Sequence, residues 1–176
     1  MSTAVETIHE EIRAAFPPTR SKPFEPLVSS TQGDEPAQVM RAFQNKTDWT
    51  LLRDDWLEAI PCALHFLSNE ALCFYIPAFL EADLRGQLNM ADPVFTLTHG
   101  FAHGMSDMPM RGRNPPTYGD YARARWAPLT PQQALAIVHY LEWCVAQKKP
   151  GSDDITEALQ AYWYKRAAGL PPHTRT

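Results

Sequence analysis

Proline divides this sequence into short segments that favour helices over strands. Most of its 16 prolines lie in three clusters, at residues 17–26, 109–116 and 171–172. Because proline has no amide hydrogen and its ring clashes with the preceding turn, each cluster is expected to separate regular elements. Between the clusters, apolar residues recur every three or four positions, and no stretch shows the strict alternation of a half-buried strand. The sequence therefore predicts an all-α protein, an irregular bundle of about five to seven helices.

The N-terminal part of the chain is predicted to hold two helices and a set of shorter turns. The apolar face of the first helix repeats at helical spacing in Val5, Ile8, Ile12 and Phe16. This helix ends at Pro17-Pro18, and a short second helix begins near Asp34. Residues 49–67 suit helical turns that are broken near Pro61.

The central helix is predicted to begin after Ser68. A serine before a helix caps it by accepting a hydrogen bond from an amide of the first turn. The apolar stripe that follows has helical spacing and consists of Leu72, Ile76, Leu80, Leu84 and Leu88, widened by Tyr75 and Phe79. Pro77 lies inside this span and is expected to kink the helix or to divide it in two.

Two further helices are predicted near the C-terminal end. Residues 130–133 (TPQQ) combine a capping threonine, a proline at the first helical position and a glutamine three residues after the cap, which is typical of a helix start. This helix is expected to run to about Lys148 and to end before Gly151. Ser152 is expected to cap the last helix.

Residues 86–128 show little helical periodicity and are predicted to form one long variable loop, with at most one helical piece near residues 93–101. The stretch is rich in Gly, Pro, Met and Arg. Loops of this length are uncommon in compact domains and often carry function. Because 176 residues fit one domain, we expect a single helical domain over residues 1–176 that carries this loop.

The charge balance argues against nucleic acid or a membrane surface as a partner. Sixteen Lys and Arg stand against 20 Asp and Glu, which gives a net charge of −4. A chain of this charge is not attracted as a whole to phosphate backbones or anionic bilayers. The N-terminus lacks the basic and apolar regions of a signal peptide, and no apolar run is long enough to span a bilayer. We expect a cytoplasmic protein without a membrane segment.

The residues that carry common cofactor or catalytic chemistry do not form a recognisable set. The three cysteines, Cys62, Cys73 and Cys144, are far apart and are interpreted as buried thiols. No glycine-rich phosphate loop and no nucleophile motif occurs, so we expect no cofactor. Glu70 is interpreted as a first-turn acid of the central helix, and Glu81 and Asp83 as part of its solvated face.

Several motifs resemble a bacterial family of small proteins catalogued as a domain of unknown function. They are residues 66–80 (FLSNEALCFYIPAFL), residues 129–133 (LTPQQ) and residues 140–143 (YLEW). The resemblance extends over about residues 49–163 and implies a shared fold. It implies no catalytic residue, because that family offers none to transfer. This chain differs from the family mainly in a longer variable loop, which includes residues 99–110.

His99 and His103 are the clearest candidates for metal binding. On a helix, side chains four residues apart lie on one face, so two imidazoles at this spacing can share a metal ion. Gly100 stands where a metalloprotease helix has its catalytic glutamate, so that mechanism is not supported. A site needs at least one more ligand, for which the candidates are Asp92, Asp107 and His65. The alternative is that both histidines are structural or exposed to solvent.

A group of arginines and tyrosines in the same loop is predicted to bind a partner. Its members are Arg111, Arg113, Tyr118, Tyr121 and Arg125. Arginine and tyrosine are favoured at the hot spots of protein interfaces. Arginines beside aromatic rings suit an acidic protein surface, phosphate or nucleic acid. The alternative is a solvated loop whose arginines pair locally with Asp107 and Asp120.

These observations favour a non-catalytic protein-binding module over an enzyme. A specific version is a bacterial immunity protein that neutralises a cognate toxin, because such inhibitors are often small, acidic and free of catalytic residues. Two alternatives remain open at this point. One is a metal-dependent enzyme that uses His99 and His103, and the other is a homo-oligomeric structural protein.

Overall fold

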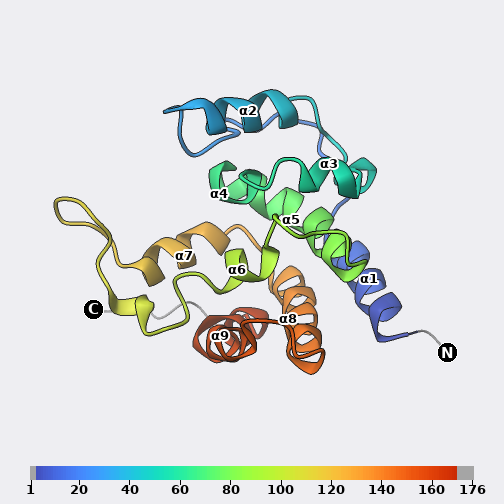
Figure 1. Cartoon of the computed structure of the whole chain (residues 1–176), viewed down its shortest axis with the longest axis vertical. Coiled ribbons are helices and arrows are strands. Elements are labelled where there is room, and N and C mark those ends of the chain that lie inside the picture. The colour runs from blue at the N-terminus through green and yellow to red at the C-terminus, as the bar shows by residue number, and fades with distance from the viewer. Residues whose placement is uncertain (1–2, 170–176) are drawn as a thin grey trace. The chain divides into compact units, whose positions relative to one another are not determined.

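The computed structural model describes residues 3–169, and over this range the chain forms helices, turns and three isolated backbone bridges but no strand (Figure 1). The predicted all-α class is confirmed. The chain divides into two compact units, one formed by residues 9–96 and the other by the residues that precede and follow them. The single-domain organisation stays a prediction, and each unit is described by itself below.

The unit of residues 9–96 is built around α5 (Asn69–Leu84). Its other helical elements are most of α1 (Ala4–Ala15), α2 (Asp34–Phe43), η1 (Trp49–Leu51), α3 (Asp54–Glu58), α4 (Ala63–Phe66) and the first four residues of α6 (Pro93–Thr98). The predicted break near Pro61 is confirmed, because α3 ends before it and α4 begins after it. The helices are more numerous and shorter than the sequence suggested.

Helix α5 is continuous through Pro77. The side-chain oxygen of Ser68 accepts a hydrogen bond from the amide of Ala71 at 3.4 Å, so the predicted cap is confirmed. The expectation that Pro77 divides the helix is wrong. Twelve of the 16 residues of α5 are buried, so packing on nearly all sides holds the helix together where its own backbone ladder lacks a donor.

Aromatic rings form the core of this unit. The ring of Tyr75, on α5, lies 4.8 Å from that of Phe43 and 5.7 Å from that of Phe24. Trp49 is buried, and its indole N–H donates to the carbonyl of Pro17 at 2.8 Å. The core therefore joins α5 to the end of α2 and to the irregular chain that follows α1.

The other unit contains the helices of the C-terminal half. They are α7 (Tyr118–Trp126), α8 (Pro131–Ala146), α9 (Ser152–Ala158), the π-helical turn η3 (Leu159–Trp163) and α10 (Tyr164–Ala167). The start of α8 is as predicted, because Thr130 and Gln133 form a reciprocal capping box. The cap of α9 differs: Gly151 occupies that position, and the Ser152 hydroxyl donates back to the carbonyl of Lys149 at 2.6 Å.

The predicted loop of residues 86–128 contains more helix than expected. α6 (Pro93–Thr98) is the helical piece that the sequence suggested, and the short 3-10 turn η2 (Met105–Asp107) and the nine-residue α7 were missed. α7 begins with a capping box between Thr117 and Asp120. It was missed because its buried side carries Gly119 and Ala122, small residues that give little apolar periodicity, together with Trp126.

Tryptophan and tyrosine also form the core of this unit. The Trp163 ring lies 5.6 Å from that of Trp126, and its indole N–H donates to the carbonyl of Leu97 at 3.0 Å. Phe101 stacks on Tyr162 with ring centroids 4.4 Å apart. These contacts fix the chain around residues 97–101 against η3.

Among residues 3–169, no helix has the length and apolar character needed to cross a bilayer.

Cys73 and Cys144 are buried as predicted, but Cys62 is only half-buried. Partial burial and the charge of Glu35 raise the pKa of the Cys62 thiol.

Candidate functional site

A projecting loop precedes α7 in the unit that contains the C-terminal helices α7 to α10 (Figure 1). At its base, the amide of Met110 donates to the carbonyl of Pro116 and the amide of Tyr118 donates to that of Met108, both at 3.0 Å. These bonds flank an antiparallel bridge between Pro109 and Thr117. The loop therefore leaves the unit from a base held by backbone hydrogen bonds. We call residues 108–117 the arginine loop.

The tip of the arginine loop carries two of the predicted binding residues. Arg111 and Arg113 are both exposed. Gly112 between them has φ 139° and Asn114 after them has φ 54°, values that turn the chain sharply. The next two residues are prolines, which restrict the return of the chain towards α7. The two guanidinium groups are thus presented to solvent by a constrained turn.

The other three predicted binding residues lie on α7 rather than in a loop. Tyr118, Tyr121 and Arg125 follow one another at spacings of three and four, so they line one side of the helix. Tyr121 is 37% exposed, whereas Tyr118 and Arg125 are half-buried. The structure thus divides the predicted group into an exposed pair on the loop and a row on the helix. The binding role of all five residues stays a prediction.

Two glycines allow the chain around residues 100–106 to approach α7 closely. A Cβ atom at Gly100 would lie 2.7 Å from the carbonyl oxygen of Tyr118, and one at Gly119 would lie 2.7 Å from that of Ser106. Real Cβ atoms do not approach backbone oxygen so closely. The first turn of α7 is therefore seated directly on the preceding chain, which fixes the root of the arginine loop.

His99 and His103 do not share a helix. α6 ends at Thr98, Gly100 has φ 89° and His103 itself has φ 57°, so the chain turns between the two imidazoles. The helical spacing on which the metal prediction depended is therefore wrong. Within the described part of the chain, no group of three or more His, Cys, Asp or Glu side chains is placed to hold a metal ion.

The two histidines instead make contacts within their own unit. The His99 ring meets the Tyr118 ring edge-on, with centroids 5.8 Å apart. The Nε2 atom of His103 lies 2.9 Å from a carboxylate oxygen of Asp154, and its amide donates to Glu157 at 2.8 Å. Both contacts favour the structural interpretation of this pair.

The interpretation of Glu81 as part of the solvated face of the central helix is wrong. The Glu81 side chain is buried on α5 and contacts His9, Arg13 and Arg85. Burial raises the pKa of the Glu81 carboxyl. The hydrogen bond and charge of Arg13, the hydrogen bond of Arg85 and the charge of His9 together outweigh this effect, so the pKa lies below its ordinary value. A carboxylate held ionised by two arginines does not serve as a general acid at neutral pH.

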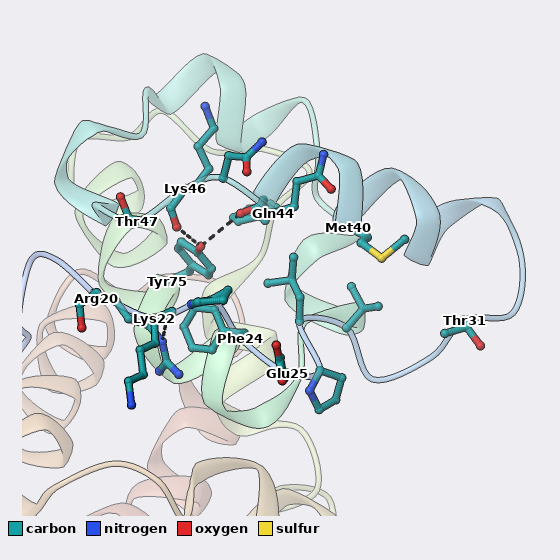
Figure 2. Close-up of a pocket in the computed structure, with 17 residues that line it drawn as sticks. Arg20, Lys22, Phe24, Glu25, Thr31, Met40, Gln44, Lys46, Thr47 and Tyr75 are labelled. Atoms are coloured by element: carbon teal, nitrogen blue, oxygen red, sulfur yellow. Dashed lines mark hydrogen bonds between the residues drawn. The ribbon is translucent and has the colours of Figure 1, made fainter.

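A second candidate site is a cavity of about 650 Å³ in the unit of residues 9–96 (Figure 2). Its walls come from the irregular segment of residues 20–28, from the end of α2 with the turn after it, and from Tyr75 of α5. This cavity was not predicted from the sequence, because irregular segments carry no periodicity. The signal available in the sequence was Phe24, a lone aromatic residue among prolines and charged residues. In the structure, Phe24 belongs to no helix and yet is buried.

The comparison with protein families matches residues 28–167 to a family of unknown function, DUF6714. The chain belongs to this family. The expected membership of an uncharacterised family is thus confirmed, and the match begins earlier and ends later than the resemblance suggested. Neither the comparison with curated proteins nor that with solved structures finds a match. The DUF6714 match contains the whole arginine loop and α7. Of the cavity lining, it contains Met40, Phe43 and Tyr75, whereas Arg20 and Phe24 lie before the matched residues.

Proposed function

We propose that this chain is a non-catalytic protein-binding module that docks through the arginine loop and the adjoining side of α7. The observation that carries the proposal is the exposure of Arg111 and Arg113 at the tip of a loop whose base is held by backbone hydrogen bonds. A loop that is already ordered loses little conformational entropy when a partner binds it.

The composition around the loop supports a protein partner. Met108 at the base is 51% exposed, and Tyr121 on α7 is 37% exposed. Arginine, tyrosine and methionine are enriched at protein interfaces. The two arginines complement an acidic surface, and such a charge pairing speeds association and weakens with salt. The expected partner is therefore a protein with an acidic patch.

The most specific form of the proposal is an immunity protein whose partner is a toxin. The chain would then inhibit by covering the toxin's working surface, and no chemistry of its own would be required. This form rests on analogy with small acidic inhibitors and not on the fold.

The experiment begins with capture of partners from the native cell on the tagged chain, followed by calorimetry with the purified partner. Replacing Arg111 and Arg113 together with alanine is expected to weaken binding at least about tenfold, equivalent to about 1.4 kcal/mol, without changing the melting temperature. The control carries Arg41→Ala and Lys165→Ala, which remove the same charge from exposed helix positions. Equal affinity of all three proteins would overturn the proposed interface.

The toxin form has its own test. The captured partner is expected to stop growth when it is expressed alone, and co-expression of the wild-type chain is expected to restore growth. The variant without Arg111 and Arg113 is expected to restore it less well. A partner that is harmless when expressed alone would refute the toxin form and leave the protein-binding module in place. A stable homo-oligomer in light scattering, with no other partner captured, would instead favour the structural alternative.

A further inference from the structure

The cavity beside Phe24 has the size and the walls of a small-molecule site. Ligand pockets in proteins usually enclose about 300–1,000 Å³ and combine apolar walls with a few polar groups. This cavity has a volume of about 650 Å³. Phe24, Val28 and Phe43 supply buried apolar side chains to it, and Met40 is 43% exposed beside them. Methionine is flexible and adapts to ligands of different shape.

The charge of the cavity lining is opposite to that of the whole chain. Three cationic residues line it, Arg20, Lys22 and Lys46, and Glu25 is the one acidic residue of the lining. The chain as a whole has a net charge of −4. A cationic lining in an acidic protein indicates a preference for an anionic ligand.

Arg20 is the lining cation whose position is best defined. Its guanidinium lies 3.8 Å from the centroid of the Phe24 ring, and its Nε–H donates to the carbonyl of Lys22 at 2.6 Å. Its Nη2 atom forms an ion pair with a carboxylate oxygen of Glu70 at 3.8 Å, which is longer than a normal hydrogen bond, so the guanidinium keeps hydrogen-bond donors for a ligand. Figure 2 places Lys22 next to Arg20. The two side chains mark where an acidic head group would bind.

Two further polar side chains of the lining, Tyr75 and Lys46, make contacts within the protein. The Tyr75 hydroxyl donates to the carbonyl of Lys46 and lies 3.5 Å from that of Phe43 (Figure 2). The Lys46 ammonium lies 5.2 Å from the centroid of the Trp56 ring. Tyr75 therefore fastens the turn after α2, and neither group is placed as a nucleophile or a base. The cavity is suited to binding rather than to chemistry.

We infer that this cavity binds a small organic acid with an apolar, preferably aromatic, body and one carboxylate. The carboxylate pairs with Arg20 and Lys22, and the body lies against Phe24, Phe43 and Met40. Arginine binds carboxylates through two parallel hydrogen bonds, and its planar group also stacks on aromatic rings. This site lies in the unit of residues 9–96, so the inference is independent of the arginine loop.

The test follows methionine methyl signals by NMR while 2-naphthoate is added to the full chain. The Met40 methyl is expected to shift with saturation at sub-millimolar concentration, while the methyls of Met90 and Met108, which are exposed but do not line the cavity, remain in place. A titration with decanoate, a carboxylate whose apolar body is aliphatic, tests the preference of the cavity for an aromatic body. The neutral analogue 2-naphthalenemethanol is expected to bind at least fivefold more weakly than the acid, and acetate is expected to leave the signals unchanged.

Variants separate the head-group contact from a general effect of charge. Arg20→Gln and Lys22→Gln are each expected to weaken naphthoate binding at least threefold while leaving the neutral alcohol unaffected. Arg41→Gln removes the same charge from the position next to Met40 but not from the cavity wall, and is expected to have no effect. Equal binding of acid and alcohol, equal shifts of all three methyls, or no Met40 shift at millimolar naphthoate would each overturn the inference. If Arg20→Gln lowers the melting temperature, Lys22→Gln, at an exposed position, still decides the matter.

Discussion

The guanidinium of Arg13 binds the carboxylate of Glu81 through two parallel hydrogen bonds, Nε to Oε1 at 2.7 Å and Nη2 to Oε2 at 3.0 Å. The two residues are 68 positions apart, and they fasten α1 to α5 inside the unit of residues 9–96. The Glu81 side chain is 5% exposed and that of Arg13 is 62% exposed. Arg85 adds a third hydrogen bond at 3.3 Å. The acid is thus the buried partner, and the arginines reach it from the surface.

Removing the charge of Glu81 is expected to destabilise the protein more than removing Arg13. Glu81→Gln removes the negative charge that Arg13 and Arg85 share and turns one of the two acceptor oxygens into an amide donor. A loss of about 2 kcal/mol in the free energy of unfolding is expected. Arg13→Gln is expected to cost about 1 kcal/mol or less, because Arg13 is largely exposed and Arg85 remains. Urea titrations measure both values. Glu10→Gln, at an exposed position of α1, is the control and should change stability by less than about 0.5 kcal/mol.

The same carboxylate makes stability depend on pH in the acid range. The pKa of Glu81 is lowered in the folded state, so its stabilising contribution is complete above the ordinary value of 4.5 and is lost as the pH falls through the folded pKa. The stability difference between wild type and Glu81→Gln is therefore expected to shrink as the pH is lowered from 6 to about 3. Denaturant titrations at several pH values measure it. A constant difference would show that Glu81 is not held ionised by its arginines.

Gly119→Ala is expected to destabilise the protein although it improves helix propensity. In an exposed helix position this change would stabilise by up to about 1 kcal/mol. At Gly119, however, the new methyl group would lie 2.7 Å from the backbone oxygen of Ser106, so one of the two segments must move. A net loss of roughly 2 kcal/mol is expected in thermal or urea unfolding. A gain in stability would show that the root of the arginine loop is not packed as described.

Thr130→Ala tests the start of α8. The Thr130 hydroxyl accepts a hydrogen bond from the amide of Gln133 at 3.2 Å, and the Gln133 side chain accepts one from the amide of Thr130 at 2.8 Å. Loss of the first bond is expected to cost about 1 kcal/mol. Gln132→Ala, on the exposed side of the same turn, should cost less than about 0.5 kcal/mol. Two equally harmless substitutions would contradict the capping box.

Local sequence signals predicted the helix starts well, because capping needs only residues three positions apart. Ser68 and Thr130 were recognised in this way, and the same signal at Thr117 and Asp120 was present but was not used. Pro77 misled the prediction, because a local rule for proline does not account for packing around the whole of α5. The spacing of His99 and His103 misled it as well, since α6 ends at Thr98 and Gly100, with its positive φ, turns the chain between the two histidines.

The candidate sites could be predicted only in part, because they depend on contacts between distant residues. Arg111 and Arg113 were found from their composition and are exposed, but the weak apolar periodicity around Tyr121 did not indicate that it belongs to a helix. The cavity joins residues 20–28 to α2 and α5, and irregular chain carries no pattern that predicts such a meeting. The burial of Glu81 depends in the same way on Arg13, 68 residues away.

Tyr75 is expected to make the protein less stable in alkali. Burial raises the pKa of its hydroxyl to about 12, and the charge of Arg20 offsets only part of this effect. Because the folded pKa lies above the ordinary value of 10.0, the stabilising contribution is complete below pH 10 and is lost as the pH rises towards 12. Wild-type stability should therefore fall over this range by more than that of Tyr75→Phe, which has no hydroxyl to ionise. At neutral pH, Tyr75→Phe is expected to cost about 1 kcal/mol, because the Lys46 carbonyl loses its donor. Ultraviolet titration of the tyrosinates, with Tyr121→Phe as the exposed control, measures the pKa directly. A Tyr75 that ionises near pH 10 would show that its hydroxyl is not buried as described.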